Sequence, residues 1–94
     1  MSAQAYELAQ ILINTYPDEI KPHAVYADIL YTDNHFQEAK EQYLIVLEKD
    51  KTKSEVWSQV LFIQAEQSDF SGMLNTSDEA LTYFPTDPLF YYFN

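Results

Sequence analysis

The chain has 94 residues, enough for one small domain or part of one, and carries five lysines, no arginine and fifteen acidic residues. Its net charge of -10 disfavours nucleic acid and anionic membrane surfaces as partners, because both need a basic protein surface. Apolar residues make up 47%, which excludes a disordered chain, no apolar run is long enough to span a membrane, and the lack of cysteine excludes disulfides and thiolate metal sites.

Apolar residues recur at steps of three and four along the chain, which predicts helices rather than strands. Prolines and short polar breaks divide this pattern into segments. The predicted helices cover residues 2–16, about 21–33, about 35–49, about 53–67 and about 70–83, and a sixth begins at 88. Loops this short make consecutive helices antiparallel neighbours.

Several expected helix starts carry cap signals. Asn34 with Gln37, and Thr52 with Glu55, have the spacing of a capping box, in which two side chains bond to free backbone N–H groups. The other predicted N-caps are Asp69 and Asp87, the latter followed by Pro88.

The pattern repeats every 34 residues. When the sequence is shifted against itself by this number, the helix breaks align, and apolar residues align in both helices of each unit. A period of this length is typical of helical repeat proteins, in which each unit needs a neighbour to cover its apolar face. The aligned sets include Ile13 with Leu47 and Leu81, Phe36 with Phe70, and His23 with Trp57.

A helix-turn-helix unit of 34 residues resembles the tetratricopeptide repeat. The residues that agree with its pattern are Trp57 at the tryptophan position, Val60-Leu61 at Leu-Gly, Ala39 with Tyr43 at the alanine and aromatic positions, and Pro17 and Pro85 at the closing proline. The departures are His23 for tryptophan, Ala27 and Leu61 for glycine, Lys51 for proline, and Met73 and Ser77 for the alanine and aromatic residues. The alternative is an unrelated small helical bundle with a chance period.

The resemblance implies an all-α fold in which antiparallel helix pairs form a right-handed superhelix. In this register, residues 1–17 are the second helix of a repeat, 20–53 and 54–87 are full repeats, and 88–94 begin the next helix. We therefore expect the chain to be a segment of a longer multi-repeat protein. The compartment stays open between the bacterial cytoplasm and the periplasm or envelope, because acidic repeat proteins without arginine resemble those of bacterial envelopes.

The sequence contains no arrangement typical of catalysis or of metal or cofactor binding. His23 and His35 belong to different helices and lack the HxxxH or HExxH spacing of a zinc site. We expect His23 to pack in place of tryptophan and His35 to be a solvated turn residue. We therefore expect no enzyme activity, no catalytic residue, no cofactor and no metal.

In the tetratricopeptide family, the first helix of each repeat lines a concave groove that binds extended peptides or helices. The resemblance therefore implies a non-catalytic scaffold that binds protein. The alternative is an accessory module that packs within a larger enzyme or envelope assembly and has no ligand of its own. The residues carried over to the groove are Lys21, Asp28, Tyr31, Glu55, Gln59, Phe62 and Glu66.

The expected groove is acidic and includes two aromatic residues, Tyr31 and Phe62. Some family members hold the C-terminal carboxylate of a peptide with basic and amide side chains. Here Lys21 is the one basic residue carried over, so that clamp is not expected. A basic or apolar partner segment suits this groove better.

The C-terminal stretch PLFYYFN places four aromatic residues at the start of the sixth helix. We expect a stacking surface of this kind either to fold back on the fifth helix or to pair with a second copy as a homodimer. Phe90 and Tyr91 are the expected inward-facing pair. The candidates for self-association are Phe90, Tyr91, Tyr92 and Phe93.

Overall fold

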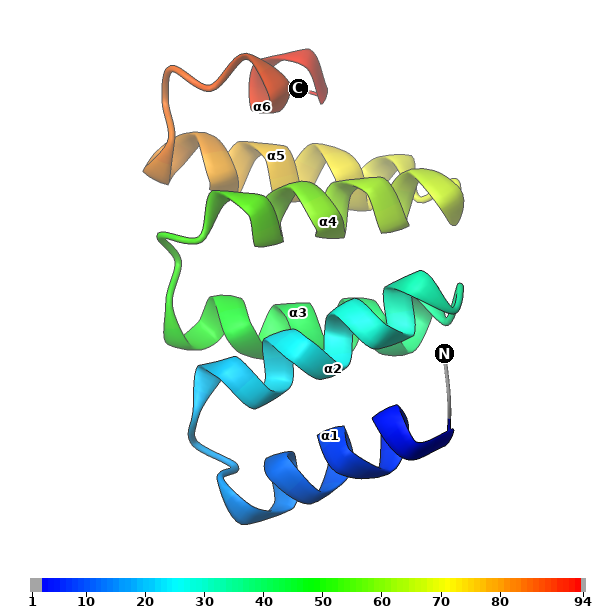
Figure 1. Ribbon diagram of the computed structural model, residues 1–94. Coiled ribbons are helices and arrows are strands. Elements are labelled where there is room, and N and C mark those ends of the chain that lie inside the picture. The colour runs from blue at the N-terminus through cyan, green and yellow to red at the C-terminus, as the bar shows by residue number, and fades with distance from the viewer. Residues whose placement is uncertain (1–2, 94) are drawn as a thin grey trace. The chain divides into compact units, whose positions relative to one another are not determined.

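The computed structural model describes the backbone of residues 3–93 and the side chains of residues 3–92, and this part of the chain contains six helices and no strand (Figure 1). This confirms the expected all-α fold, with helix bounds within one or two residues of those predicted. The helices are α1 (Ala3–Thr15), α2 (Ile20–Thr32), α3 (Phe36–Lys49), α4 (Ser54–Glu66), α5 (Phe70–Tyr83) and α6 (Pro88–Phe93).

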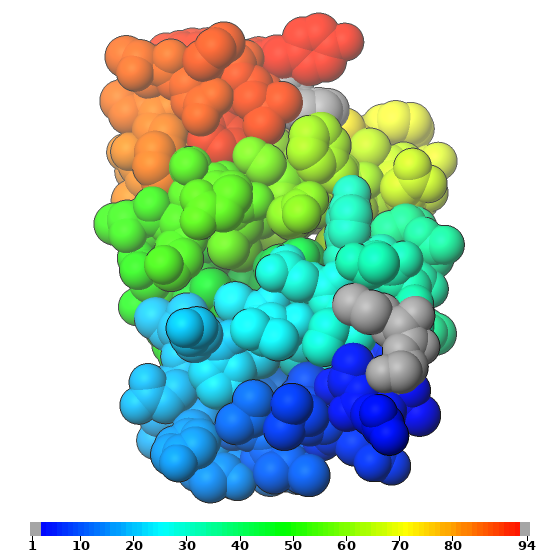
Figure 2. Space-filling model, in the orientation of Figure 1, coloured from blue at the N-terminus to red at the C-terminus, as the bar shows by residue number. Residues whose placement is uncertain are grey.

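The chain forms two compact units, which meet in sequence at Asp50 and Lys51. In the first unit, α2 packs against both α1 and α3, and Figure 2 shows the side chains of α1 and α2 meeting at the surface. In the second unit, α5 packs against both α4 and α6. Each helix therefore packs against its neighbour in sequence within its unit, as short loops require.

The helix bounds recur with the period of the sequence. The first residues of α2, α4 and α6 are 34 apart, and so are the first residues of α3 and α5. The last residues of α1, α3 and α5 are also 34 apart. Below, two residues separated by 34 or 68 positions are called equivalent. By this register α2, α4 and α6 are equivalent helices, and α1, α3 and α5 form the other set.

The end of α2 is a Schellman motif, in which a left-handed residue lets the chain bond back to the last helical turn. Asn34 has a φ of 64°. The His35 N–H donates to the Leu30 carbonyl at 2.8 Å, and the Asn34 N–H donates to the Tyr31 carbonyl at 3.0 Å. Asn34 thus ends α2, and the prediction that it caps α3 is wrong. The N-cap of α3 is His35, whose side chain makes no capping bond.

The end of α4 has the same motif at equivalent residues. Ser68 has a φ of 55°, and its N–H donates to the Ala65 carbonyl at 3.1 Å. The Asp69 N–H donates to the Gln64 carbonyl at 2.9 Å. Neither left-handed residue is a glycine, although glycine adopts this conformation most easily. The two units therefore share an uncommon backbone conformation at the same position of the repeat.

Of the three remaining cap predictions, two are confirmed and one is wrong. The Asp69 side chain accepts from the Gly72 N–H at 3.0 Å, which confirms the predicted cap of α5. The Asp87 side chain accepts from the Leu89 N–H at 3.0 Å, as expected of an N-cap two residues earlier. The capping box of Thr52 is wrong, because the N-cap of α4 is Lys53, which makes no side-chain capping bond.

A buried ring with an N–H group occupies equivalent positions in the two units. His23 is 6% exposed, and its Nε2 lies 3.0 Å from the Pro17 carbonyl oxygen. Trp57 is 3% exposed, and its Nε1 donates to the Lys51 carbonyl at 3.0 Å. Pro17 and Lys51 are themselves equivalent. Each ring therefore fastens the first helix of a pair to the loop that precedes it, and the expectation that His23 packs in place of tryptophan is confirmed.

Candidate functional site

The predicted groove residues of the first unit lie on one face of α2. Lys21, Asp28 and Tyr31 are separated by seven and three positions, a spacing that puts side chains on one side of a helix. Lys21 and Asp28 are exposed, and Tyr31 is half-buried. The structure thus brings these three residues together along one helix.

Helix α3 contacts two of these three residues. The Tyr43 hydroxyl donates to the Asp28 carboxylate at 2.5 Å, and the Tyr31 ring lies edge-to-face with Phe36 at a centroid distance of 5.6 Å. Burial, followed by the bond to Asp28, raises the pKa of Tyr43. The hydroxyl therefore stays protonated and holds the Asp28 carboxylate toward α3.

The predicted groove residues of the second unit lie on one face of α4. Glu55, Gln59, Phe62 and Glu66 follow one another at steps of four, three and four. Both glutamates are exposed, Gln59 is half-buried, and Phe62 is 41% exposed. The face of α4 thus combines two carboxylates at its ends with an aromatic ring between them.

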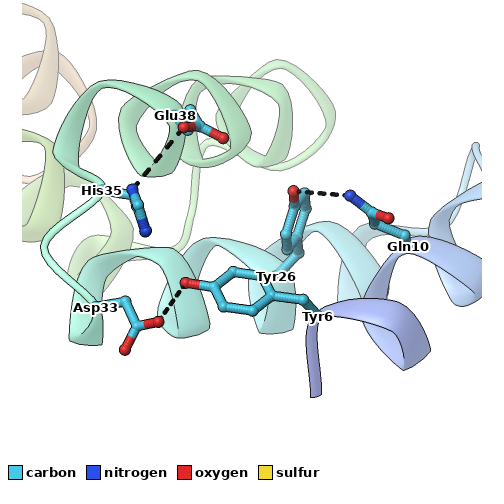
Figure 3. Close-up of polar contacts among 6 residues, drawn as sticks. All are labelled: Tyr6, Gln10, Tyr26, Asp33, His35 and Glu38. Atoms are coloured by element: carbon cyan, nitrogen blue, oxygen red, sulfur yellow. Dashed lines mark hydrogen bonds and ion pairs between the residues drawn. The ribbon is translucent and has the colours of Figure 1, made fainter. Parts of the chain in front are cut away.

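Polar contacts link α1 to α2 in the first unit, and a further one lies at the start of α3 (Figure 3). The Tyr6 hydroxyl of α1 donates to the Asp33 carboxylate at the end of α2, at 2.6 Å. The Tyr6 ring lies edge-on to the Tyr26 ring at 6.3 Å and to the His35 ring at 6.2 Å. Tyr6 is therefore the centre of an aromatic and hydrogen-bonded contact between α1 and the turn that follows α2.

The Tyr6–Asp33 bond changes the titration of both groups. Burial, followed by the hydrogen bond to Asp33, raises the pKa of Tyr6 to about 12. The same bond lowers the pKa of Asp33. Sequence reasoning missed this pair, because its members are 27 residues apart and Asp33 was assigned only to a helix break. The expected antiparallel packing of α1 on α2 is the one sequence signal that could have found this pair, because it places the start of α1 near the end of α2.

The two histidines have different surroundings. His23 is buried, and because the Pro17 carbonyl can only accept, Nε2 must carry the proton. Its Nδ1 lies 2.7 Å from the side-chain amide of Gln42. His35 is exposed, with Nδ1 4.0 Å from Glu38 Oε1, as expected for a solvated turn residue. Over residues 3–92, no three histidine or acidic side chains gather as metal ligands would.

The C-terminal aromatic residues divide between the inside and the outside of the second unit. Phe90 is fully buried, with its ring 5.9 Å from that of Phe84. Tyr91 is 60% exposed and Tyr92 is exposed as well, so the prediction that Tyr91 faces inward with Phe90 is wrong. Phe90 therefore packs toward the end of α5, whereas the side chain of Tyr91 points away from the core of this unit. The side chain of Phe93 lies outside the described part.

No family model matches the chain, and a search of curated proteins also finds no match. None of the helices in the described part of the chain is both long and apolar enough to cross a membrane.

Proposed function

We propose that the chain is a tetratricopeptide-like repeat segment in which the two full helix pairs stack in a right-handed superhelix. The support is the 34-residue recurrence of features that the period alone does not require. These are the helix bounds, the left-handed turn residues Asn34 and Ser68, and the ring donors His23 and Trp57. In this proposal α2 and α4 are the first helices of their repeats and line one concave face.

The proposed function is non-catalytic binding of a protein segment along the first-helix faces. The observation that carries it is the face of α4, where Glu55 and Glu66 flank the partly exposed ring of Phe62. Carboxylates of this kind attract lysine and arginine, and a half-exposed aromatic ring gains contact area when an apolar side chain covers it. The partner is therefore a segment that combines basic and apolar residues.

Binding is tested with fluorescently labelled peptides and measured by anisotropy. We expect a peptide of alternating lysine and leucine to bind more tightly than its counterpart in which glutamate replaces lysine. Charge reversal of both acids, Glu55→Lys with Glu66→Lys, should weaken binding of the basic peptide by about tenfold, which is about 1.4 kcal/mol. A matched control is Glu48→Lys with Glu79→Lys, which reverses two exposed acids on α3 and α5 and changes the net charge equally.

Two results would contradict this proposal. A preference for the acidic peptide would exclude the electrostatic part of the argument. Equal weakening by Glu48→Lys with Glu79→Lys would show attraction by the net charge of the chain rather than by the face of α4.

The second candidate function is an accessory module that packs within a larger assembly and has no ligand of its own. The observation that favours it is on α2, where α3 already contacts Asp28 and Tyr31. If this candidate holds, Tyr43→Phe should leave peptide binding unchanged, because neither face takes a ligand. If the α2 face binds a basic segment, the same change frees the Asp28 carboxylate and should strengthen binding.

A further inference from the structure

The faces of α2 and α4 differ at equivalent positions. Phe62 is equivalent to Asp28, and Ser77 is equivalent to Tyr43. In the first unit, the Tyr43 hydroxyl of α3 donates to the Asp28 carboxylate. In the second unit, the Ser77 hydroxyl donates to the Leu74 carbonyl of its own helix, at 3.0 Å. The second helix of the first unit therefore holds an acid at this position, whereas the second unit presents an aromatic ring that is 41% exposed.

The charges along the two faces differ as well. Glu55 and Glu66 lie 11 positions apart on α4, and both are exposed. Their equivalents on α2 are Lys21 and Thr32. At a rise of about 1.5 Å per residue, the two glutamates lie about 16 Å apart along the helix axis, with Phe62 between them. The face of α4 therefore has acidic ends and an aromatic centre, an arrangement that α2 lacks.

The spacing of the α4 face is that of a seam between two packed helices. Its four residues are Glu55, Gln59, Phe62 and Glu66. They follow one another at steps of four, three and four, as the residues of a helix-helix seam do. Two small residues, Ser58 and Ala65, lie beside Phe62 and let another helix approach closely. The Ser58 hydroxyl already donates to the Ser54 carbonyl at 3.2 Å, so covering it leaves no donor unpaired.

We propose that the partner segment binds as an amphipathic helix along α4, with two basic residues 11 positions apart and two apolar residues between them, at steps of four, three and four. This inference rests on the proposed function and adds the conformation and the spacing of the partner. The steps match those of α4 because two helices packed side by side advance equally per residue. Glu55 and Glu66 select the basic ends, and the ring of Phe62 selects the apolar centre.

An extended segment does not fit the same three side chains. It advances about 3.3 Å per residue, so about three residues lead from Glu55 to Phe62 and about five lead to Glu66. Residues three apart in a strand point to opposite faces, so one of the three contacts is lost. In a helix, residues separated by four, seven and eleven positions lie on one face. The spacing of the α4 face therefore selects a helical partner.

The test compares three labelled peptides of equal length and charge in a background of alanine and glutamine. The first has lysine, leucine, leucine and lysine at steps of four, three and four. The second has the same composition, with the leucines moved to the helix face opposite the lysines. The third is the first with a central alanine replaced by proline, which prevents a continuous helix. Anisotropy measures the affinity, and circular dichroism measures the helix gained by the peptide on binding.

We expect the first peptide to gain helix and to bind about tenfold more tightly than the other two. Phe62→Ala should weaken its binding, whereas Leu44→Ala, at an exposed apolar position on α3, is the matched control and should not. Circular dichroism verifies that both variants keep their helix content.

Two results would overturn the inference in distinguishable ways. Equal binding of the three peptides, or equal weakening by Phe62→Ala and Leu44→Ala, would refute a helical partner on α4 and leave binding of a basic, apolar segment standing. If none of these peptides binds, and the alternating lysine-leucine peptide does not bind either, the proposed function fails together with the inference.

Discussion

His23 and Trp57 have chemically different rings that make the same kind of hydrogen bond at equivalent positions. Both are buried, and both direct an N–H toward the carbonyl of a residue six positions earlier. That carbonyl belongs to the loop between a second helix and the following first helix. A large, mostly apolar ring with an N–H donor at its edge fills the buried space beside the helix and provides a hydrogen bond to the backbone carbonyl of the loop.

The first prediction removes one of these donors. Trp57→Phe loses the N–H that bonds to the Lys51 carbonyl and leaves a smaller ring in a buried position. We expect the free energy of unfolding to fall by about 2 kcal/mol. Urea unfolding followed by circular dichroism measures this change. Tyr91→Phe, at the exposed equivalent position, should change stability by less than about 0.5 kcal/mol, and an equal effect of both changes would contradict the account.

The second prediction concerns alkaline pH. The pKa of Tyr6 is raised from 10.0 to about 12 in the folded chain, and that of Tyr43 is also raised. Both contributions to stability are therefore complete below pH 10 and disappear as the pH rises through the folded values. We expect the unfolding midpoint in urea to fall steadily above pH 10. Tyr6→Phe together with Tyr43→Phe should flatten this dependence, and an unchanged slope in the double variant would refute it.

At acidic pH the dependence of stability on pH has the opposite sign, since stability falls as the pH falls. The pKa of Asp33 is lowered by its bond to Tyr6, so its contribution is present above the ordinary value of 3.8 and disappears as the pH falls through the folded value. In Tyr6→Phe the hydroxyl donor is gone. We therefore expect acid unfolding of this variant to depend less steeply on pH below 4 than that of the wild type, and a steeper dependence would contradict the assignment.

Residue chemistry explains which of these features the sequence predicted. His23 was correctly placed, because its alignment with Trp57 fixed its position. Asn34 was assigned to the wrong function, because asparagine suits both an N-cap and a left-handed helix end. The sequence contains no signal that separates these two uses. The bonds of Tyr6 to Asp33 and of Tyr43 to Asp28 require the packing of two helices, which spacing within one helix does not give.

At the scale of single helices, the glycine in the first turn of α5, Gly72, lies in close contact with the N-cap side chain of Asp69. A Cβ on Gly72 would overlap the Asp69 carboxylate and would lie 2.9 Å from Gln64 Nε2. A side chain at residue 72 would therefore displace the Asp69 side chain from the position in which it accepts from the Gly72 N–H. This interaction accounts for a glycine inside a helix, where glycine is otherwise unfavourable.

The third prediction is that substitutions of Gly72 and Asp69 have non-additive effects on the free energy of unfolding. Gly72→Ala alone should leave stability nearly unchanged, since a gain of about 1 kcal/mol in helix propensity is offset by displacement of the cap. Asp69→Ala should cost about 1 kcal/mol. With the cap already removed, Gly72→Ala should stabilise the chain by about 1 kcal/mol. Urea unfolding of the three variants forms a double-mutant cycle, and additivity would show that cap and glycine are independent.

The helices themselves were predictable, and their ends less so. The periodicity of apolar residues located each helix, because burying one face requires that spacing. Four of the predicted helix starts depended on caps. Two of these caps are wrong, because Asn34 forms the left-handed end of α2 and the N-cap of α4 is Lys53. On α6, register alone assigned Tyr91 to the inside, but its side chain is 60% exposed. The faces of α2 and α4 were predictable, since each is set by spacing along one helix.

For the whole molecule, the dominant electrostatic feature is the charge of -10, with fifteen acids and five lysines. The fourth prediction is that salt stabilises the fold, because screening reduces repulsion that is stronger in the compact state. Between low and high sodium chloride we expect a gain of about 1 kcal/mol, or a thermal midpoint higher by about 4–8 °C. Calorimetry at two protein concentrations separates this effect from self-association. A midpoint that is independent of salt would contradict it.

The proposed binding of a basic, apolar segment by the faces of α2 and α4 is tested by titrating isotope-labelled chain with the lysine-leucine peptide and following backbone amide chemical shifts. We expect progressive shifts along Ile20–Thr32 and Ser54–Glu66, with α1 and α5 unaffected. No shifts at millimolar peptide, or shifts confined to α5 and α6, would contradict it.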